Sequence, residues 1–273
     1  MKTCLTVKCK YCKSKNVIKY GHYKATQLWL CKDCKHKFTD NQAIPGLRTP
    51  SNQMTLAVDM YYKGIPLDVI GKRLNKKYNT YISNSTIYRW VNKFPLLGFH
   101  ETRHCQPTVG DTWFVNQIEV KIGPKIYQIL DVIDIETYFL IVSKVHEKSD
   151  SKEIDILLEN AILATGKHPK QIVGIGNIDY LEKPVRNNNI TLFDLQTIGS
   201  IDKSYLKSIK LLHSFIKDRN KVFSYLKSAE QIEKAINGWL YHYNYFGKIH
   251  NLLNGINPAE RAQASHPTSF PQH

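Results

Sequence analysis

The sequence predicts an α/β protein in which a mixed sheet with flanking helices follows two smaller N-terminal parts. Three observations support this fold class. Two closely spaced cysteine pairs stand near the start of the chain, a region of helical periodicity follows them, and three β-rich runs joined by short turns then lead into alternating strands and helices. A meander followed by such alternation is typical of a mixed sheet covered by helices. We therefore expect the main core in the last part.

The cysteine pairs predict a metal site. Cys9 and Cys12 form the first pair, Cys31 and Cys34 the second, with two residues inside each pair and eighteen between them. This spacing is typical of a zinc ribbon, because each pair can form a turn that brings two thiolates to one tetrahedral ion. We expect a structural Zn²⁺ on all four thiolates, supplying the folding energy of a very small core. Disulfides are the alternative, disfavoured because no signal peptide precedes the pairs.

The residues between the pairs predict a hairpin. Val17–Tyr20 and Gln27–Leu30 are β-rich, and we expect the turn between these strands at Gly21–His22. Because four thiolates complete the coordination shell of zinc, His22 and His36 are expected to be solvated rather than bound to metal.

Residues 52–95 predict three helices. The first has apolar residues at helical spacing and ends at Gly64, and the second begins at Pro66, a residue suited to the first position of a helix. Capping side chains at Ser83–Thr86 introduce the third, predicted over Ile87–Phe94 and followed by Pro95.

The last two helices have the features of a helix-turn-helix, whose second helix, here Asn84–Lys93, lies in the major groove of DNA. Ile87, Trp90 and Val91 repeat at the spacing of a buried face. Arg89 is the best base-reading candidate, because a guanidinium can bind guanine with two hydrogen bonds. The alternative is a plain three-helix bundle with a solvated basic face. The candidate DNA-binding residues are Asn84, Ser85, Thr86, Tyr88, Arg89 and Lys93.

Residues 108–265 predict the mixed sheet. The three β-rich runs form an antiparallel meander, a helix follows, two further strands flank a less certain helix, and two helices end the order β-β-β-α-β-(α)-β-α-α. The predicted ranges are strands at Trp113–Ile122, Lys125–Ile133, Tyr138–Val145, Lys170–Ile175 and Ile190–Leu195, and helices at Lys152–Thr165, Lys203–Asp218 and Ser228–Tyr243.

Composition favours a polyanionic partner. The 273 residues include 38 Lys and Arg against 23 Asp and Glu, a formal net charge of +15. Nucleic acid is the first candidate for so basic a chain. An anionic membrane surface is the competing partner, but no apolar run approaches the roughly 18 residues of a spanning helix. Unpaired or zinc-bound thiols and the lack of a targeting segment predict a reducing, cytoplasmic setting.

Taken in order, these parts resemble the DDE transposases of bacterial and archaeal insertion sequences, whose catalytic domain has the RNase H-like (integrase) fold. The resemblance runs from Cys9 to Ala262 and implies a zinc ribbon at 1–45, a helix-turn-helix domain at 52–95, an RNase H-like domain at 108–265 and a disordered tail at 266–273. The local matches are Ser85–Val91, Gly110–Val115, Ile216–Val222, Trp239–Tyr245, His250, Leu253 and Ile256–Ala262.

The resemblance implies three carboxylates that hold two Mg²⁺ ions for cleavage and transfer of DNA strands. The first falls on Asn116, the second on Gly176 (Ile175 in a shifted register) and the third on Lys210. None of these residues carries a carboxylate, and a lysine reverses the charge that Mg²⁺ requires. We therefore expect no bound Mg²⁺ and no catalytic residues at the degenerate positions.

The expected function is a transposase-like DNA-binding protein of insertion-sequence origin that no longer cuts. Its expected partners are double-stranded DNA such as element terminal repeats, further copies of itself, and active transposases in mixed oligomers. A zinc-dependent protein-assembly module is one alternative. The other is an active DDE transposase with displaced carboxylates, of which Asp179 is the best stand-in; the candidates are Asp111, Glu119, Asp131, Asp134, Asp179 and Asp194.

Overall fold

The computed structural model describes residues 7–23, 26–39, 49–102, 106–122, 124–147, 151–175, 178–195, 209–213, 216, 220–223, 226, 228–247 and 255–264. The chain divides into two compact units, the first reaching Ala57 and the second beginning at Val58. The second unit therefore holds the helix-turn-helix segment together with the large sheet, and the three-part division stays a prediction. Gly176, the 266–273 tail and most of the helix predicted at Lys203–Asp218 lie outside the described residues.

The ribbon is a three-stranded antiparallel sheet of β1 (Val17–Tyr23), β2 (Thr26–Cys31) and β3 (Lys37–Thr39), in that order. The turn predicted at Gly21–His22 is wrong, because both residues lie inside β1, and Tyr23 pairs with Thr26. The register shifts between Lys19 and Gly21, and Gly21 has φ +131°, a conformation that suits glycine. The glycine thus marks a β-bulge rather than a turn.

Three helices follow: α1 (Ser51–Tyr62), α2 (Leu67–Tyr78) and α3 (Asn84–Thr102). The predicted end of the third helix at Phe94 is wrong, because α3 continues through Pro95. Proline removes one helical hydrogen bond. Tertiary packing offsets that cost: a Cβ at Gly98 would overlap the Tyr241 ring of α8 (Ala229–Phe246), so the helix backbone lies directly on the ring.

The large sheet has five strands: β4 (Thr112–Ile122), β5 (Lys125–Asp134), β6 (Leu140–His146), β7 (Gln171–Gly174) and β8 (Thr191–Asp194). Their order is β6-β5-β4-β7-β8, with β4, β5 and β6 antiparallel and β7 and β8 parallel to β4. An antiparallel meander extended by two parallel strands is the RNase H-like arrangement, so the predicted fold class is confirmed.

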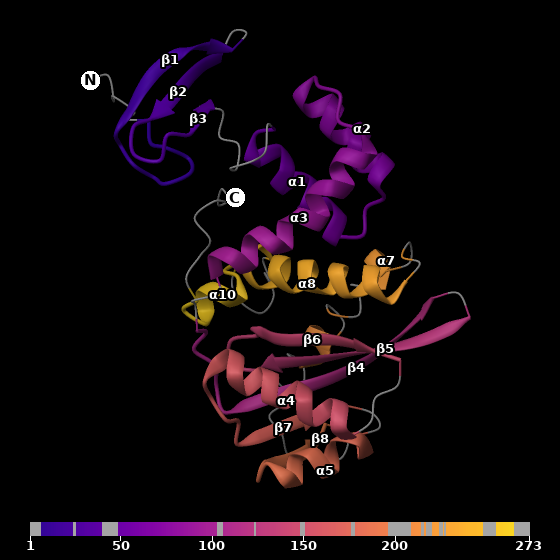
Figure 1. The fold of residues 1–273 in the computed structure, drawn as a ribbon. Helices are drawn as coiled ribbons and strands as arrows, with labels where there is room; N and C mark the ends of the chain where they lie inside the picture. Colours follow the sequence, from indigo (N-terminus) through magenta and orange to yellow (C-terminus); the bar gives the residue numbers. More distant parts are fainter. Residues whose placement is uncertain are drawn as a thin grey trace. The chain divides into compact units, whose positions relative to one another are not determined.

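Helices cover this sheet on one face and along one edge. In Figure 1, α4 (Ser151–Thr165) and α5 (Asp179–Asn187) lie over one face, and α8 lies alongside the edge strand β6. The core of this unit includes Phe114 and Ile129 from the central strands and Leu158 from α4, all fully buried. The short helices α7 (Asn220–Phe223) and α10 (Pro258–Arg261) complete the described elements. None of the helices in the described part of the chain is both long and apolar enough to span a membrane.

The Tyr243–Tyr245 motif attaches α8 to the edge strand β6. The Asn244 amide accepts a hydrogen bond from the backbone N–H of Leu140 at 2.9 Å and donates one to its carbonyl at 2.8 Å. The Tyr243 hydroxyl donates to the carbonyl of Tyr138 at 2.8 Å. Asn244 therefore satisfies backbone groups at the sheet edge as a further strand would.

Candidate functional site

The four predicted zinc ligands come together in the ribbon. Their Sγ atoms all lie within 4.8 Å of one another, with 3.5 Å between Cys9 and Cys34 and 3.5 Å between Cys12 and Cys31. Cys9 and Cys31 are fully buried in the ribbon core beside Phe38. Tetrahedral coordination with Zn–S bonds of about 2.3 Å needs sulfurs about 3.8 Å apart. The donor set and its spacing therefore fit a zinc ion.

The electrostatics of the cluster also favour a cation. The backbone N–H of Cys34 lowers the pKa of the Cys31 thiol to about 7. The backbone N–H of His36 favours the Cys34 thiolate, but burial and the neighbouring thiols outweigh it and raise the pKa of Cys34 to about 12. Four thiolates so close together repel one another, and a bound Zn²⁺ would remove that repulsion. His22 and His36 are both exposed, as the sequence predicts.

The helix-turn-helix segment has the predicted buried face. Ile87, Trp90 and Val91 of α3 are 0%, 4% and 4% exposed. The turn before them is held by Asn75 of α2, whose side-chain oxygen accepts a hydrogen bond from the backbone N–H of Ile82 at 2.7 Å. This hydrogen bond ties the turn before α3 to the end of α2.

The outer face of the segment is polar and basic. Asn84, Ser85, Tyr88 and Arg89 are exposed, and Thr86 and Lys93 are half-buried. The Arg89 guanidinium donates to Thr86 Oγ1 at 3.2 Å, which holds the arginine along the first turns of α3. The exposed basic residues of α2 are Lys72, Arg73, Lys76 and Lys77.

The position of the first expected carboxylate is a buried hydrogen-bonding residue. Asn116 lies in the middle of β4 and is fully buried. It pairs across the sheet with Asp131 of β5, which pairs in turn with Ser143 of β6. Asn116 Nδ2 donates to Asp131 Oδ2 at 3.2 Å, and the Ser143 hydroxyl donates to Asp131 Oδ1 at 2.5 Å. Three neighbouring strands therefore share one polar row.

A helical segment at 209–213 supplies the next partner of this row. Nδ1 of His213 lies 2.7 Å from Asn116 Oδ1, whereas Lys210 is exposed. Of the two residues, His213 is therefore the one that reaches the β4 position. On the other side, Val115 pairs with Gly174 at the end of β7, so Ile175 comes level with Asn116. The sequence reasoning named Asp131 only as a possible displaced carboxylate, and it missed His213, Ser143 and the contacts of this row, because a contact across the sheet has no signature along one strand.

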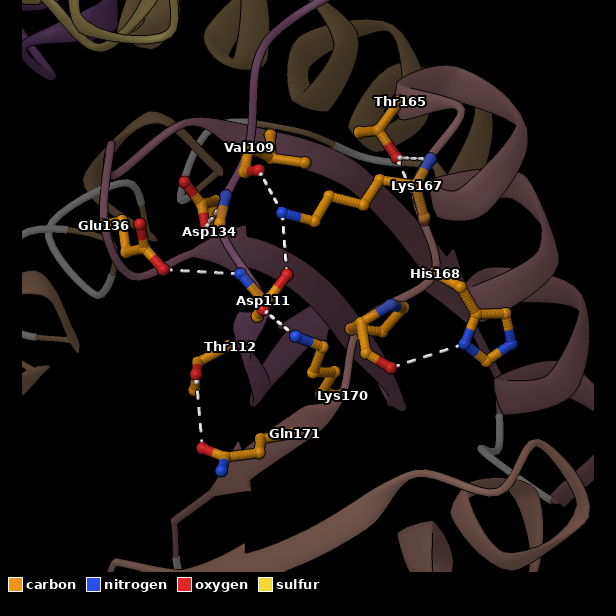
Figure 2. A network of polar contacts seen from close by, with 12 residues as sticks. Val109, Asp111, Thr112, Asp134, Glu136, Thr165, Lys167, His168, Lys170 and Gln171 are labelled. Carbon is orange, nitrogen blue, oxygen red and sulfur yellow. Dashed lines mark hydrogen bonds and ion pairs between the residues drawn. The ribbon is translucent and has the colours of Figure 1, made fainter.

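Two of the acids proposed as displaced ligands are occupied elsewhere. Figure 2 shows Asp111 just before β4, where Lys167 and Lys170 contact its carboxylate at 2.8 and 2.7 Å and hold its pKa at about 2. Asp134 ends β5 and accepts hydrogen bonds from the backbone N–H of Gly110 at 3.0 Å and of Thr137 at 2.9 Å. Both carboxylates stabilise loops.

The other candidate acids do not gather into a metal group. Glu119 is exposed further along β4, Asp179 begins α5, and Asp194 ends β8. Within the described ranges, the four cysteines form the one group of three or more metal-binding residue types whose donor atoms cluster. The residues assigned to Mg²⁺ do not fit that ion: Asn116 offers a neutral oxygen already paired with His213, glycine has no side chain, and lysine is cationic.

Comparison with protein-family models gave no match, and comparison with curated proteins gave none either. Among solved structures, a chain of the simian T-cell lymphotropic virus intasome in complex with PP2A regulatory subunit B56 gamma is 11% identical over 74% of each chain, with a TM-score of 0.44. The HTLV-2 integrase catalytic core domain in complex with magnesium is similar at 15% identity in its dimeric form, over 56% of this chain and 94% of that one, with a TM-score of 0.38. Its trimeric form is 14% identical over 57% and 97%, with a TM-score of 0.40. The fold assignment follows from the strand order β6-β5-β4-β7-β8.

Proposed function

We propose that this chain is a transposase-like DNA-binding protein of insertion-sequence origin whose RNase H-like domain no longer cleaves DNA. The observation that carries the proposal is the environment of Asn116. Its amide is fully buried and hydrogen-bonded at both ends, to Asp131 and to His213. A metal-binding strand position must offer a charged oxygen to an open site. Asn116 offers neither, and its neighbours form a closed polar core.

The proposed DNA contact is the outer face of α2 and α3. Arg89 lies on the exposed side of the second helix, opposite the buried Trp90 and Val91. The basic residues of α2 supply phosphate contacts beside it, and the net charge of +15 favours a polyanion. Double-stranded DNA, for example the terminal repeats of an element, fits this surface. Assembly with itself or with active transposases through the RNase H-like domain belongs to the same proposal.

The test combines binding and cleavage on one DNA. Zinc-loaded full-length protein is titrated against labelled duplexes from the DNA that flanks its gene, at several salt concentrations. Binding is expected to weaken steeply with salt, with a log–log slope near −0.9 for each phosphate contact. No nicking is expected with Mg²⁺ or Mn²⁺. Metal-dependent cleavage that disappears in Asp179→Ala would instead establish a displaced active site.

Two matched variants separate base reading from phosphate binding. Arg89→Ala is expected to cost about 1–3 kcal/mol on the preferred sequence and less on unrelated DNA. Lys77→Ala is expected to weaken all duplexes alike and to reduce the salt slope by about one contact. Equal losses on every sequence for Arg89→Ala would make Arg89 a phosphate contact. Salt-independent binding, or none, would contradict the proposal.

A further inference from the structure

One face of the ribbon sheet carries apolar side chains that its core does not use. Val17, Trp29 and Phe38 pack with the cysteines on the inner face. Because side chains alternate along a strand, Ile18 and Leu30 point the other way. Ile18 pairs with Leu30, and Leu30 pairs with Lys37, so these three residues form one row across the outer face.

Tyr20 stands beside this row with a lysine on its ring. Tyr20 is 49% exposed, and Ile18 is 39% exposed. Lys37 Nζ lies 3.9 Å from the centroid of the Tyr20 ring and donates to its hydroxyl at 2.7 Å. The lysine fixes the orientation of the ring and places a positive charge next to an exposed aromatic surface. Tyr11 offers a second exposed ring in the ribbon. It is 39% exposed, and its ring stacks on that of His36 with 4.4 Å between the ring centroids.

The charge of the ribbon selects the class of partner. Residues 7–39 contain nine lysines and one acidic residue, Asp33. Ser14 and Asn16 donate hydrogen bonds to the Asp33 carboxylate. Asp33 carries one negative charge, and a zinc ion on four thiolates carries two. The positive charge of the nine lysines exceeds this sum, so the ribbon stays basic when zinc is bound. A polyanion therefore complements the charge of the ribbon as a whole, and Lys37 places part of that charge beside Tyr20.

We propose that the outer face of the ribbon binds a single-stranded nucleic acid, with an unpaired base stacked on Tyr20 and the surrounding lysines on the phosphates. Exposed rings amid lysines are the means by which proteins bind unpaired strands, because every base has a flat face. A duplex hides those faces in its own stack. The inference rests on the proposed nucleic-acid binding, but it concerns a different surface and a different form of the strand.

The test compares two labelled probes, an oligodeoxythymidine and a blunt duplex of equal length, using the zinc-loaded full chain. Tyr20→Ala is expected to weaken binding of the single strand roughly 5- to 150-fold, which is the loss of about 1–3 kcal/mol per stacked base. Duplex binding should not change. Tyr20→Phe is the matched control, since it keeps the ring and loses only the hydroxyl, and it should retain most of the affinity. Zinc content, measured for each variant, confirms that the ribbon is intact.

The outcomes separate this inference from the proposed function. Duplex binding without single-strand binding overturns the inference and leaves the proposed function standing. Single-strand binding that depends on Tyr20, without duplex binding, supports the inference and overturns the proposed binding of double-stranded DNA. Equal losses on both probes, or no loss, overturn the stacking role of Tyr20. Displacement of the single strand by polyglutamate of the same charge, as effectively as by unlabelled oligodeoxythymidine, would show a surface for anions in general and also overturn it.

Discussion

Asn116 and His213 are 97 residues apart in sequence, yet Asn116 Oδ1 lies 2.7 Å from Nδ1 of His213. The direction of this hydrogen bond follows from its neighbour. Asn116 uses its amide hydrogens toward Asp131, so its oxygen must accept, and Nδ1 of His213 carries the proton. The buried Asp131 carboxylate then receives one hydrogen bond from Asn116 and one from Ser143. Each polar group of the row has a partner of the right kind, which is what burial requires.

This arrangement predicts that Asn116→Asp is destabilising. The new carboxylate would face the buried Asp131, and two carboxylates at hydrogen-bonding distance cannot both be ionised, so one pKa rises in the folded state. A raised carboxylate pKa costs stability as pH increases, and we expect a loss on the order of 3 kcal/mol at pH 8 that shrinks toward pH 5. Urea unfolding at both pH values measures this loss of stability. Asn92→Asp, at a half-buried position of α3, is the control. An equal effect at both pH values would contradict the pairing.

Zinc is predicted to stabilise the ribbon and not the large sheet. Chelation, or Cys31→Ser, should release the metal and raise hydrogen exchange in β1–β3, because the ribbon core consists largely of the ligands themselves. Exchange in the β4–β8 sheet should not change, since that sheet belongs to the other compact unit. Elemental analysis should find about one zinc per native chain. Cys105→Ser, at a cysteine outside the two pairs, is the control and should keep the metal. Native protein without zinc would refute the site.

The ionised carboxylate of Asp59 is predicted to stabilise the protein at all but strongly acidic pH. Burial disfavours its charge, but His242 at 3.1 Å and Lys63 at 2.7 Å prevail and lower its pKa from 3.8 to about 2. A lowered folded-state pKa gives stability that is complete above pH 3.8 and is lost as pH falls through about 2. Asp59→Asn should therefore cost about 2 kcal/mol at pH 7 and remove this part of the acid dependence. Asp68→Asn, at an exposed ion pair, should cost under about 0.5 kcal/mol. Equal costs would contradict the assignment.

Asn244→Leu is predicted to loosen the edge of the large sheet. The leucine fills a similar volume but leaves the N–H and carbonyl of Leu140 without their partner. Two buried backbone groups without hydrogen bonds should cost about 2–4 kcal/mol, seen as a lower midpoint in thermal or urea unfolding. Asn188→Leu removes a single hydrogen bond, to the carbonyl of Pro184, and should cost clearly less. Similar losses from both variants would show that the edge contact has no special weight.

Patterns along the chain predicted what depends on local chemistry. The paired cysteines identified a cluster that the structure brings within 4.8 Å. The β-rich composition of three runs located the meander strands to within a few residues, and the spacing of Ile87, Trp90 and Val91 identified a face that is buried. Each of these signals is contained in one short segment, so no distant contact could override it.

Features that depend on tertiary contacts were missed or misplaced. Pro95 reads as the end of a helix, but packing of Gly98 on Tyr241 continues α3 to Thr102. Gly21 reads as a turn because the sequence cannot distinguish a turn from a bulge. The polar row through Asn116 joins residues from three strands and a helical segment, and no periodicity connects them.

The length of α3 has a consequence for orientation. Arg89, near one end, and Gly98, against Tyr241, are nine residues apart on one continuous helix, a rise of about 14 Å. Because α3 packs on α8, and Asn244 of α8 binds the edge of the large sheet, DNA that fixes the direction of α3 through Arg89 would also fix the direction of the sheet.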